Sequence, residues 1–168
     1  MRTVRRLGTR VGIPNRDAVA WVLYDWANSG FVTSAVTAIL PIYYVSFVGD
    51  GGLASAYWSY TTAAALAIVT VLTPVVGAVA DHLGAQKRFL GGFVALGVTF
   101  TGALVFTGDG DLVVTSALFV CANVGWAGAN ALYDSLLPDI VGEDDIDALS
   151  TAGFAAGYLG GGVLLLAN

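Results

Sequence analysis

Long apolar stretches separated by short polar segments dominate this chain of 168 residues. No acidic residue, lysine or arginine occurs between Asp25 and Asp50, between Asp50 and Asp81, or between Arg88 and Asp109. Uncharged runs of about 20 residues are long enough to cross the hydrocarbon core of a bilayer as helices. Helices are expected there because each one satisfies its own backbone polar groups within lipid. The predicted fold class is therefore all-α, a polytopic bundle of transmembrane helices.

Five spans are predicted, and the segments that join them are short and rich in turn residues. Short connections make consecutive helices antiparallel neighbours. The sequence ends inside or just at the end of the fifth apolar run, so we expect a truncated bundle that belongs to a longer protein. The predicted organisation is a basic N-terminal arm at 1–17 and a bundle at 18–168, with helices at about 18–47, 54–80, 89–106, 112–137 and 148–167.

Composition supports a membrane protein and argues against a disulfide, a cluster of metal ligands and a nucleic-acid partner. Hydrophobic residues make up 57% of the chain and charged residues only 11%, whereas a soluble domain carries about a quarter charged residues. Cys121 and His82 are the single cysteine and histidine, so neither an internal disulfide nor a cluster of such metal ligands is expected. No basic face lies beyond the N-terminal arm, which argues against nucleic acid as a partner. The lipid bilayer is the first expected partner.

The cations predict the orientation of the chain. Five of the seven lysines and arginines precede the first span, and Lys87 and Arg88 lie between the second and third spans. Alternation of the helices then places every cation on one side, which the positive-inside rule makes cytoplasmic. We expect an integral protein of the cell (plasma) membrane with its N-terminus in the cytoplasm.

Polar residues form a stripe within the first span. Asp25, Asn28 and Ser29 are spaced i, i+3 and i+4, which places them on one face of a helix. Ionisable groups within a membrane are costly and tend to face a bundle interior or a water-filled path. Asp25 and Asn28 are therefore candidates for a substrate cavity.

A second polar stripe runs along the fourth span. Asn123, Asn130 and Asp134 are spaced by seven and four residues, again on one helical face. They complete the set of cavity candidates, and either Asp25 or Asp134 would be the proton carrier if transport is coupled to protons. The alternative is that both stripes only form hydrogen bonds between helices or at the membrane interface.

Glycines recur along the fifth span. Gly153, Gly157, Gly161 and Gly162 have the spacing of small residues that lets two helix backbones approach closely, and Gly160 lies among them. Helix packing is the main prediction for this pattern. A helix that bends within a moving bundle is the alternative.

The segment GAVADHLGAQKRF, between the second and third spans, concentrates charge in an apolar region. As a plain turn, it would use Gly84 to relieve backbone strain and Lys87 and Arg88 as anchors at the headgroups. That explanation leaves Gly77 and Asp81 unexplained. Gly77 would let the second span contact another helix, and Asp81 would pair with Lys87 or Arg88 or lie near a helix terminus.

The spacing in this segment resembles the signature of the major facilitator superfamily between its second and third helices. Gly77, Asp81, Gly84, Lys87 and Arg88 match that signature, while His82 replaces its usual basic residue. The resemblance implies that these five residues, here called the latch segment, join two halves of a transporter and govern switching between its open states.

Further motifs are similar to the vacuolar-effluxer-like branch of the superfamily, which is related to autophagy-related effluxers. These are YDWANSGF at 24–31, LPIYY at 40–44, YDSLLPDI at 133–140 and GYLGGG at 157–162. The resemblance implies about twelve helices in two halves, of which this chain holds five, so the missing C-terminal half becomes an expected partner. It also implies a cavity lined by helices one and four, and transport of small solutes such as amino acids. The fifth span partly resembles an antiporter signature, with Tyr158 in place of its proline.

The predicted function is secondary active transport of a small solute by alternating access, and this chain is not expected to transport alone. Neither an enzymatic activity nor a cofactor is expected, apart from a coupled proton or other ion. A non-transporting membrane scaffold or assembly subunit is the alternative, and a membrane-embedded enzyme is a weaker one because the polar set lacks a catalytic dyad.

Overall fold

A computed structural model describes residues 16–48 and 51–167, so the predicted basic arm lies outside the described residues except for Arg16 and Asp17. Within these two ranges every regular element is a helix and no strand occurs. Five helical segments are long and apolar enough to cross a membrane, which confirms the predicted all-α fold. They are Arg16–Ser46, Ala54–Leu83, Gln86–Phe106, Leu112–Ser135 and Glu143–Ala167.

The first span is not one uniform α-helix. Helix α2 (Arg16–Gly30) continues into the π-helical segment η2 (Phe31–Ile39), then α3 (Leu40–Tyr43) and a second π-helical segment, η3 (Tyr44–Val48). The sequence provides two physical causes for this departure from a regular α-helix. Threonine hydroxyls compete for backbone carbonyls, since Thr37 Oγ1 donates to the carbonyl of Val32 at 2.8 Å. Pro41 also lacks the N–H that would continue the α-helical ladder.

The second and third spans are more regular. Helix α4 (Ala54–Leu83) contains Pro74, and helix α5 (Gln86–Ala103) is followed by the 3₁₀ turn η5 (Leu104–Phe106). Both helices extend into the polar latch segment, which therefore contains only a short turn. The predicted ends at 80 and 89 thus fall inside helices.

The connection between the fourth and fifth spans is partly helical, although it was expected to be a loop. Helix α6 (Leu112–Ser135) is followed by the short helix α7 (Leu137–Ile140), and the 3₁₀ turn η6 (Glu143–Asp145) leads into α8 (Ile146–Ala167). Pro138 lies in the first turn of α7, where a missing N–H is tolerated.

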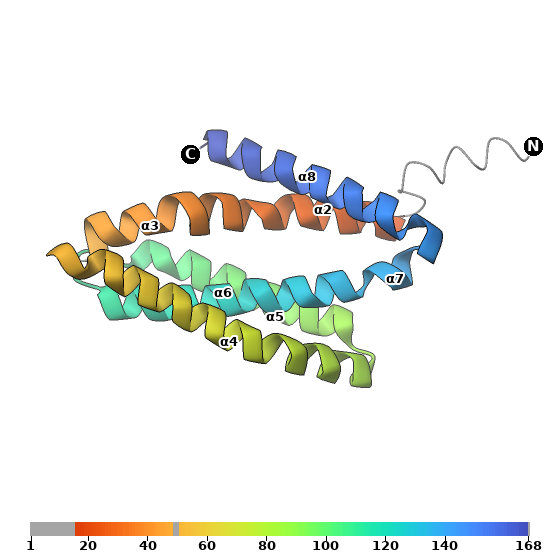
Figure 1. Cartoon of the computed structure of the whole chain (residues 1–168), viewed down its shortest axis with the longest axis horizontal. Helices are drawn as coiled ribbons and strands as arrows, with labels where there is room; N and C mark the ends of the chain where they lie inside the picture. The colour runs from red at the N-terminus through yellow and green to blue at the C-terminus, as the bar shows by residue number, and fades with distance from the viewer. Residues whose placement is uncertain (1–15, 49–50, 168) are drawn as a thin grey trace, which may run out of the picture. The chain divides into compact units, whose positions relative to one another are not determined.

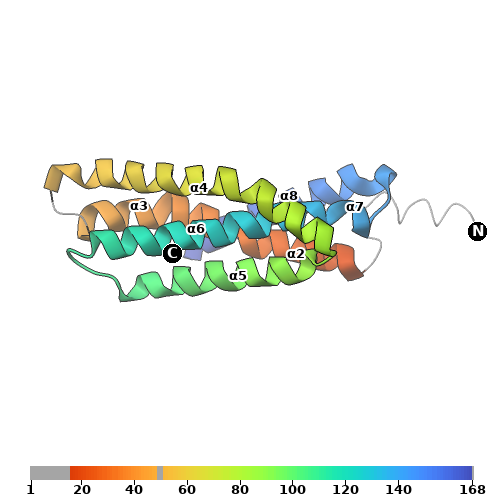
Figure 2. The same cartoon turned by 90° about the horizontal axis from the view of Figure 1, so that it is seen from below.

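The chain forms two compact units, divided near Leu40 and Leu136. In the first, α8 packs along α2, as Figure 1 shows. In the second, α6 is the central helix, because both α5 and α4 pack against it (Figure 2). A small apolar core lies between α4 and α6 and consists of Val76, Ala80 and Leu132.

Glycines determine how closely α5 and α6 approach. A Cβ atom added at Gly125 would collide with the backbone of Gly97, and one added at Gly97 would lie 3.3 Å from the amide nitrogen of Trp126. One turn along α6, Gly128 faces the ring of Phe93. Small residues at such crossings let helix backbones meet within lipid, where no hydrophobic force drives helices together.

Candidate functional site

The turn of the latch segment is built by a glycine in a left-handed conformation. Gly84 has φ 56° and ψ 36°, which only glycine adopts without strain. Its N–H donates to the carbonyl of Asp81 at 3.1 Å, and the N–H of Ala85 donates to the carbonyl of Ala80 at 3.0 Å. These two bonds form a Schellman motif that ends α4. Gly84 is therefore explained by helix termination.

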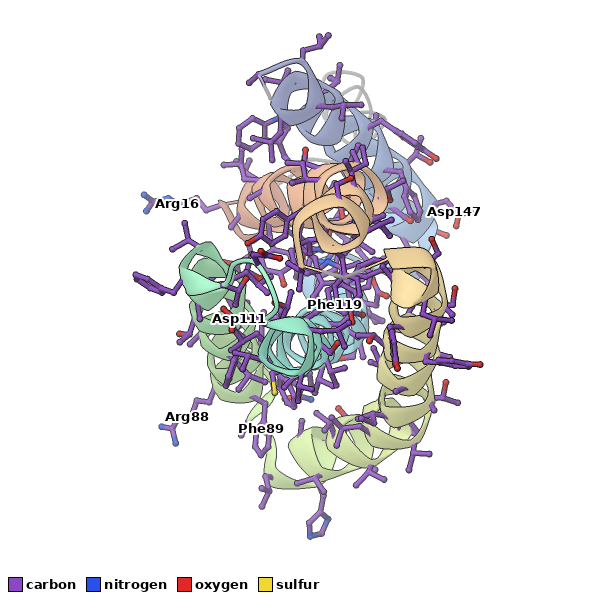
Figure 3. All side chains as sticks on the ribbon, turned by 90° about the vertical axis from the view of Figure 1, so that its left-hand side faces the viewer. Arg16, Arg88, Phe89, Asp111, Phe119 and Asp147 are labelled. Atoms are coloured by element: carbon purple, nitrogen blue, oxygen red, sulfur yellow. The ribbon has the colours of Figure 1, made fainter. Side chains whose placement is uncertain are left out.

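Asp81 has a different neighbour from those expected. Its Oδ1 accepts a hydrogen bond from Gln86 Nε2 at 3.0 Å, and among the described residues it forms no ion pair with Lys87 or Arg88. Both cations are exposed, and Arg88 points away from the helices of its unit (Figure 3). Within the described ranges, nothing lies within 4 Å of a Cβ added at Gly77. The charges of the latch segment thus remain available at the surface of this chain.

Replacing Gly84 with alanine should destabilise the end of α4 by about 1–2 kcal/mol, because a Cβ is unfavourable in the left-handed region. The measurement is the unfolding midpoint of the purified chain in detergent micelles. Gly92→Ala is the matched control, because Gly92 lies within α5 with open space around its Cβ position. Equal midpoints for the two variants would contradict this explanation of Gly84.

The polar face of α2 lies against α8. A Cβ added at Gly157 would lie 2.5 Å from Ser29 Oγ and 2.8 Å from Asp25 Oδ2. Gly157 is buried, whereas Asp25, Asn28 and Ser29 are half-buried. One turn earlier in α8, Gly153 faces the ring of Trp21. The structure therefore places the Asp25 carboxylate beside the backbone of the fifth span.

The glycines of α8 that contact α2 include one, Gly160, that is outside the predicted packing set. A Cβ at Gly161 would lie 2.5 Å from Thr33 Oγ1, and one at Gly160 would collide with the carbonyl of Trp26. Within the part of the chain that the structure describes, nothing lies within 4 Å of a Cβ at Gly162, which is exposed. Gly160 follows Gly157 by three residues and lies on the face of α8 that contacts α2, whereas helix packing at Gly162 stays a prediction.

The polar stripe of α6 lies on the face opposite its glycine contacts. Gly125 and Gly128 face α5, whereas Asn123, Asn130 and Asp134 are about half a helical turn away from them. Asn123 and Asn130 are half-buried, and Asp134 is exposed near the end of the helix. The stripes of α2 and α6 belong to different units, so their convergence on one cavity stays a prediction.

The structure adds a polar contact that the sequence analysis missed. Tyr44 Oη and Ser116 Oγ lie 2.6 Å apart, and Thr61 Oγ1 donates to Ser116 Oγ at 3.0 Å. Ser116 precedes Asn123 by seven residues, so it continues the polar stripe of α6, and that spacing was the available signal. The end of the first span and α4 are therefore both hydrogen-bonded to the polar face of α6.

The ring of Tyr44 also belongs to a cluster of three aromatic side chains. Trp58 lies 5.3 Å from the ring of Tyr44 and 4.8 Å from the ring of Phe119, measured between centroids. Phe119 is fully buried and lies among the helices of its unit (Figure 3). Centroid separations of this size are favourable for aromatic pairs. The three rings come from spans one, two and four and pack these spans against one another.

In the part of the chain that the structure describes, five helices are long and apolar enough to cross a membrane, and the latch segment joins the second to the third. These features define a polytopic membrane protein. The sequence pattern of the Major Facilitator Superfamily matches residues 4–164. The chain belongs to this superfamily.

A relative in Bacillus subtilis (strain 168) is described as an uncharacterized MFS-type transporter, YxiO. It is 36% identical over 145 residues, which are 84% of this chain and 34% of the relative. The chain thus spans about a third of that relative's length. No solved structure matches the chain.

Proposed function

We propose that this chain supplies the first five helices of a secondary active transporter that moves a small solute by alternating access. The observation that carries the proposal is the Asp25 carboxylate, half-buried in a membrane-length helix of a superfamily member. A carboxylate in such a position is costly unless it faces the bundle interior or a polar path. A role in transport would account for a carboxylate at this position.

The proposed substrate cavity lies between the polar faces of the first and fourth spans. Asp25 and Asn28 would contribute from α2, and Asn123 and Asn130 from α6. Ser116 supports this arrangement, because it lies on the same face of α6 and is hydrogen-bonded to Tyr44 of the first span. Asp134 would lie at the cytoplasmic end of the path. Either Asp25 or Asp134 would carry the proton if coupling uses protons.

The proposed partner of the latch segment is the C-terminal half of the same transporter. Asp81, Lys87 and Arg88 are exposed in this chain, and Gly77 has open space around its Cβ position. Charges that are exposed at the surface suit a contact made and broken as two halves rock against each other. Because the chain spans 34% of its relative, we propose that it does not transport alone.

The finer assignments follow the motifs of the effluxer-like branch. We propose that the solute is an amino acid and that it leaves the cytoplasm. The N-terminus would lie in the cytoplasm, as the cations indicate, and the protein would lie in the cell membrane. Neither an enzymatic activity nor a bound cofactor belongs to this proposal, in which a coupled ion is the only additional ligand.

Replacement of Asp25 with asparagine in the complete transporter tests the proposal. Flux of a panel of amino acids into liposomes should fall by roughly tenfold, the factor that about 1.4 kcal/mol produces. Asp17→Asn is the matched control, because Asp17 is exposed in the first turn of the same helix. Liposomes that contain only this chain should show no flux.

Two results would contradict the proposal. If Asp25→Asn leaves flux unchanged in a correctly folded transporter, the result would favour a non-transporting scaffold role for the proposed cavity residues. Solute uptake by the 168-residue chain alone would show that the proposed second half is not needed.

A further inference from the structure

We propose that Gly157 of α8 is a positioning residue for the Asp25 carboxylate. Because glycine has no side chain, the carboxylate and the Ser29 hydroxyl can occupy the space between α2 and α8. The inference rests on the proposed function only in giving Asp25 a role in transport. The contact itself is a property of α2 and α8.

The geometry leaves no room for a methyl group at this position. A Cβ on Gly157 would lie 2.5 Å from Ser29 Oγ, 2.8 Å from Asp25 Oδ2 and 3.4 Å from Asp25 Cγ. Distances below 3.0 Å require something to shift. The carboxylate can yield, because it is the end of a side chain with two torsions, whereas the two helix backbones are held along their length by other glycine contacts. Alanine at position 157 should therefore displace Asp25 rather than separate the helices.

Neighbouring glycines of α8 contact different groups, which makes the effect separable from packing in general. Gly153 faces the indole ring of Trp21, and Gly162 has open space around its Cβ position. Gly157 contacts the polar pair. One helix thus offers an apolar contact, a polar contact and an open position, all with the same native residue.

The consequence for Asp25 is a change in its surroundings. With glycine at 157, one side of the carboxylate is covered by the α8 backbone. With alanine, the carboxylate must turn away from α8 and lose that cover. Its reactivity toward a hydrophobic carbodiimide, which modifies carboxyl groups within membranes, should then increase.

The test uses the chain in lipid bilayers and needs no transport. Asp25 is labelled with dicyclohexylcarbodiimide at constant pH, and the modified peptide is quantified over time by mass spectrometry. Gly157→Ala should raise the labelling rate of Asp25 by about threefold or more, the factor expected for loss of one intramembrane contact. Gly153→Ala and Gly162→Ala should leave the rate within about twofold of the parent chain.

A rescue variant guards against misfolding. Ser29→Ala removes the oxygen nearest to the added Cβ, so Gly157→Ala combined with Ser29→Ala should fold like the parent. Its labelling rate should still exceed that of Ser29→Ala alone, because the added Cβ would still lie 2.8 Å from Asp25 Oδ2. An unchanged rate in Gly157→Ala, or an equal increase in Gly153→Ala, would overturn the proposal.

Labelling and flux separate the two hypotheses. If Asp25→Asn transports normally while Gly157→Ala raises labelling, the transport role of Asp25 fails and the positioning role of Gly157 stands. If Asp25→Asn abolishes flux while Gly157→Ala leaves labelling unchanged, the transport role of Asp25 stands and the positioning role of Gly157 fails.

Discussion

Valine in place of Gly125 is expected to prevent α5 and α6 from packing. A Cβ at this position collides with the backbone of Gly97, and a backbone within a helix cannot turn aside as a side chain can. Overpacking typically costs about 1–3 kcal/mol, and this contact should reach or exceed the upper figure. The measurement is unfolding of the purified chain in micelles by titration with sodium dodecyl sulfate, followed by circular dichroism.

The control for this variant lies in the helix that α6 contacts. Gly102 belongs to α5, and nothing described lies within 4 Å of its Cβ position. Gly102→Val should leave the unfolding midpoint nearly unchanged, apart from the small difference in helix propensity between glycine and valine. A midpoint for Gly125→Val that equals that of Gly102→Val would show that the close approach of α5 and α6 does not contribute to stability.

Leucine in place of Gly160 is expected to separate α8 from α2. The Cβ alone would collide with the carbonyl of Trp26, and the rest of the side chain has no space within the interface. We expect a loss of about 2–3 kcal/mol, in the range for an overpacked core. The measurement is the thermal unfolding midpoint in micelles, together with the fluorescence of Trp21 and Trp26, both of which contact α8 glycines.

Position 162 provides the matched control two residues away. Gly162→Leu adds the same side chain to the same helix where the structure has open space. This variant should unfold like the parent chain. If both leucines destabilise the chain equally, the contacting face of α8 has been assigned incorrectly.

The number and type of spans could be predicted because lipid imposes a simple rule. A segment without charge that is long enough to cross the bilayer becomes a helix, whatever its neighbours are. Hydropathy alone does not give the helix ends, because the helices continue into polar residues. Helix α4 stops at Leu83 because Gly84 provides the left-handed cap, and that signal is present in the sequence as the glycine itself.

The winding of the first span could not be predicted. Its Val- and Thr-rich segment is compatible with an α-helix by hydropathy alone, yet the structure is π-helical over Phe31–Ile39. Threonine hydroxyls that bond to backbone carbonyls, as Thr33 Oγ1 does to Ser29 at 2.9 Å, depend on local geometry rather than on periodicity. Pro41 was the available clue, since it removes a backbone donor.

Periodicity predicted which polar residues share a face, but not which helix covers that face. Asp25 and Ser29 do lie on one side of α2, and the structure shows Gly157 of α8 there. The packing prediction was based on spacings of four residues and did not include Gly160. A spacing of three also stays on one helical face, and Gly160 follows that spacing.

The contact between Asp25 and Gly157 also bears on biosynthesis. The two residues are far apart in the chain, and translation proceeds at roughly 5–20 residues per second, so α8 emerges from the ribosome on the order of ten seconds after α2. During that interval the Asp25 carboxylate and the Ser29 hydroxyl lack the helix that covers them in the folded chain. The polar face of the first span is therefore not covered by α8 until the fifth span has been synthesised.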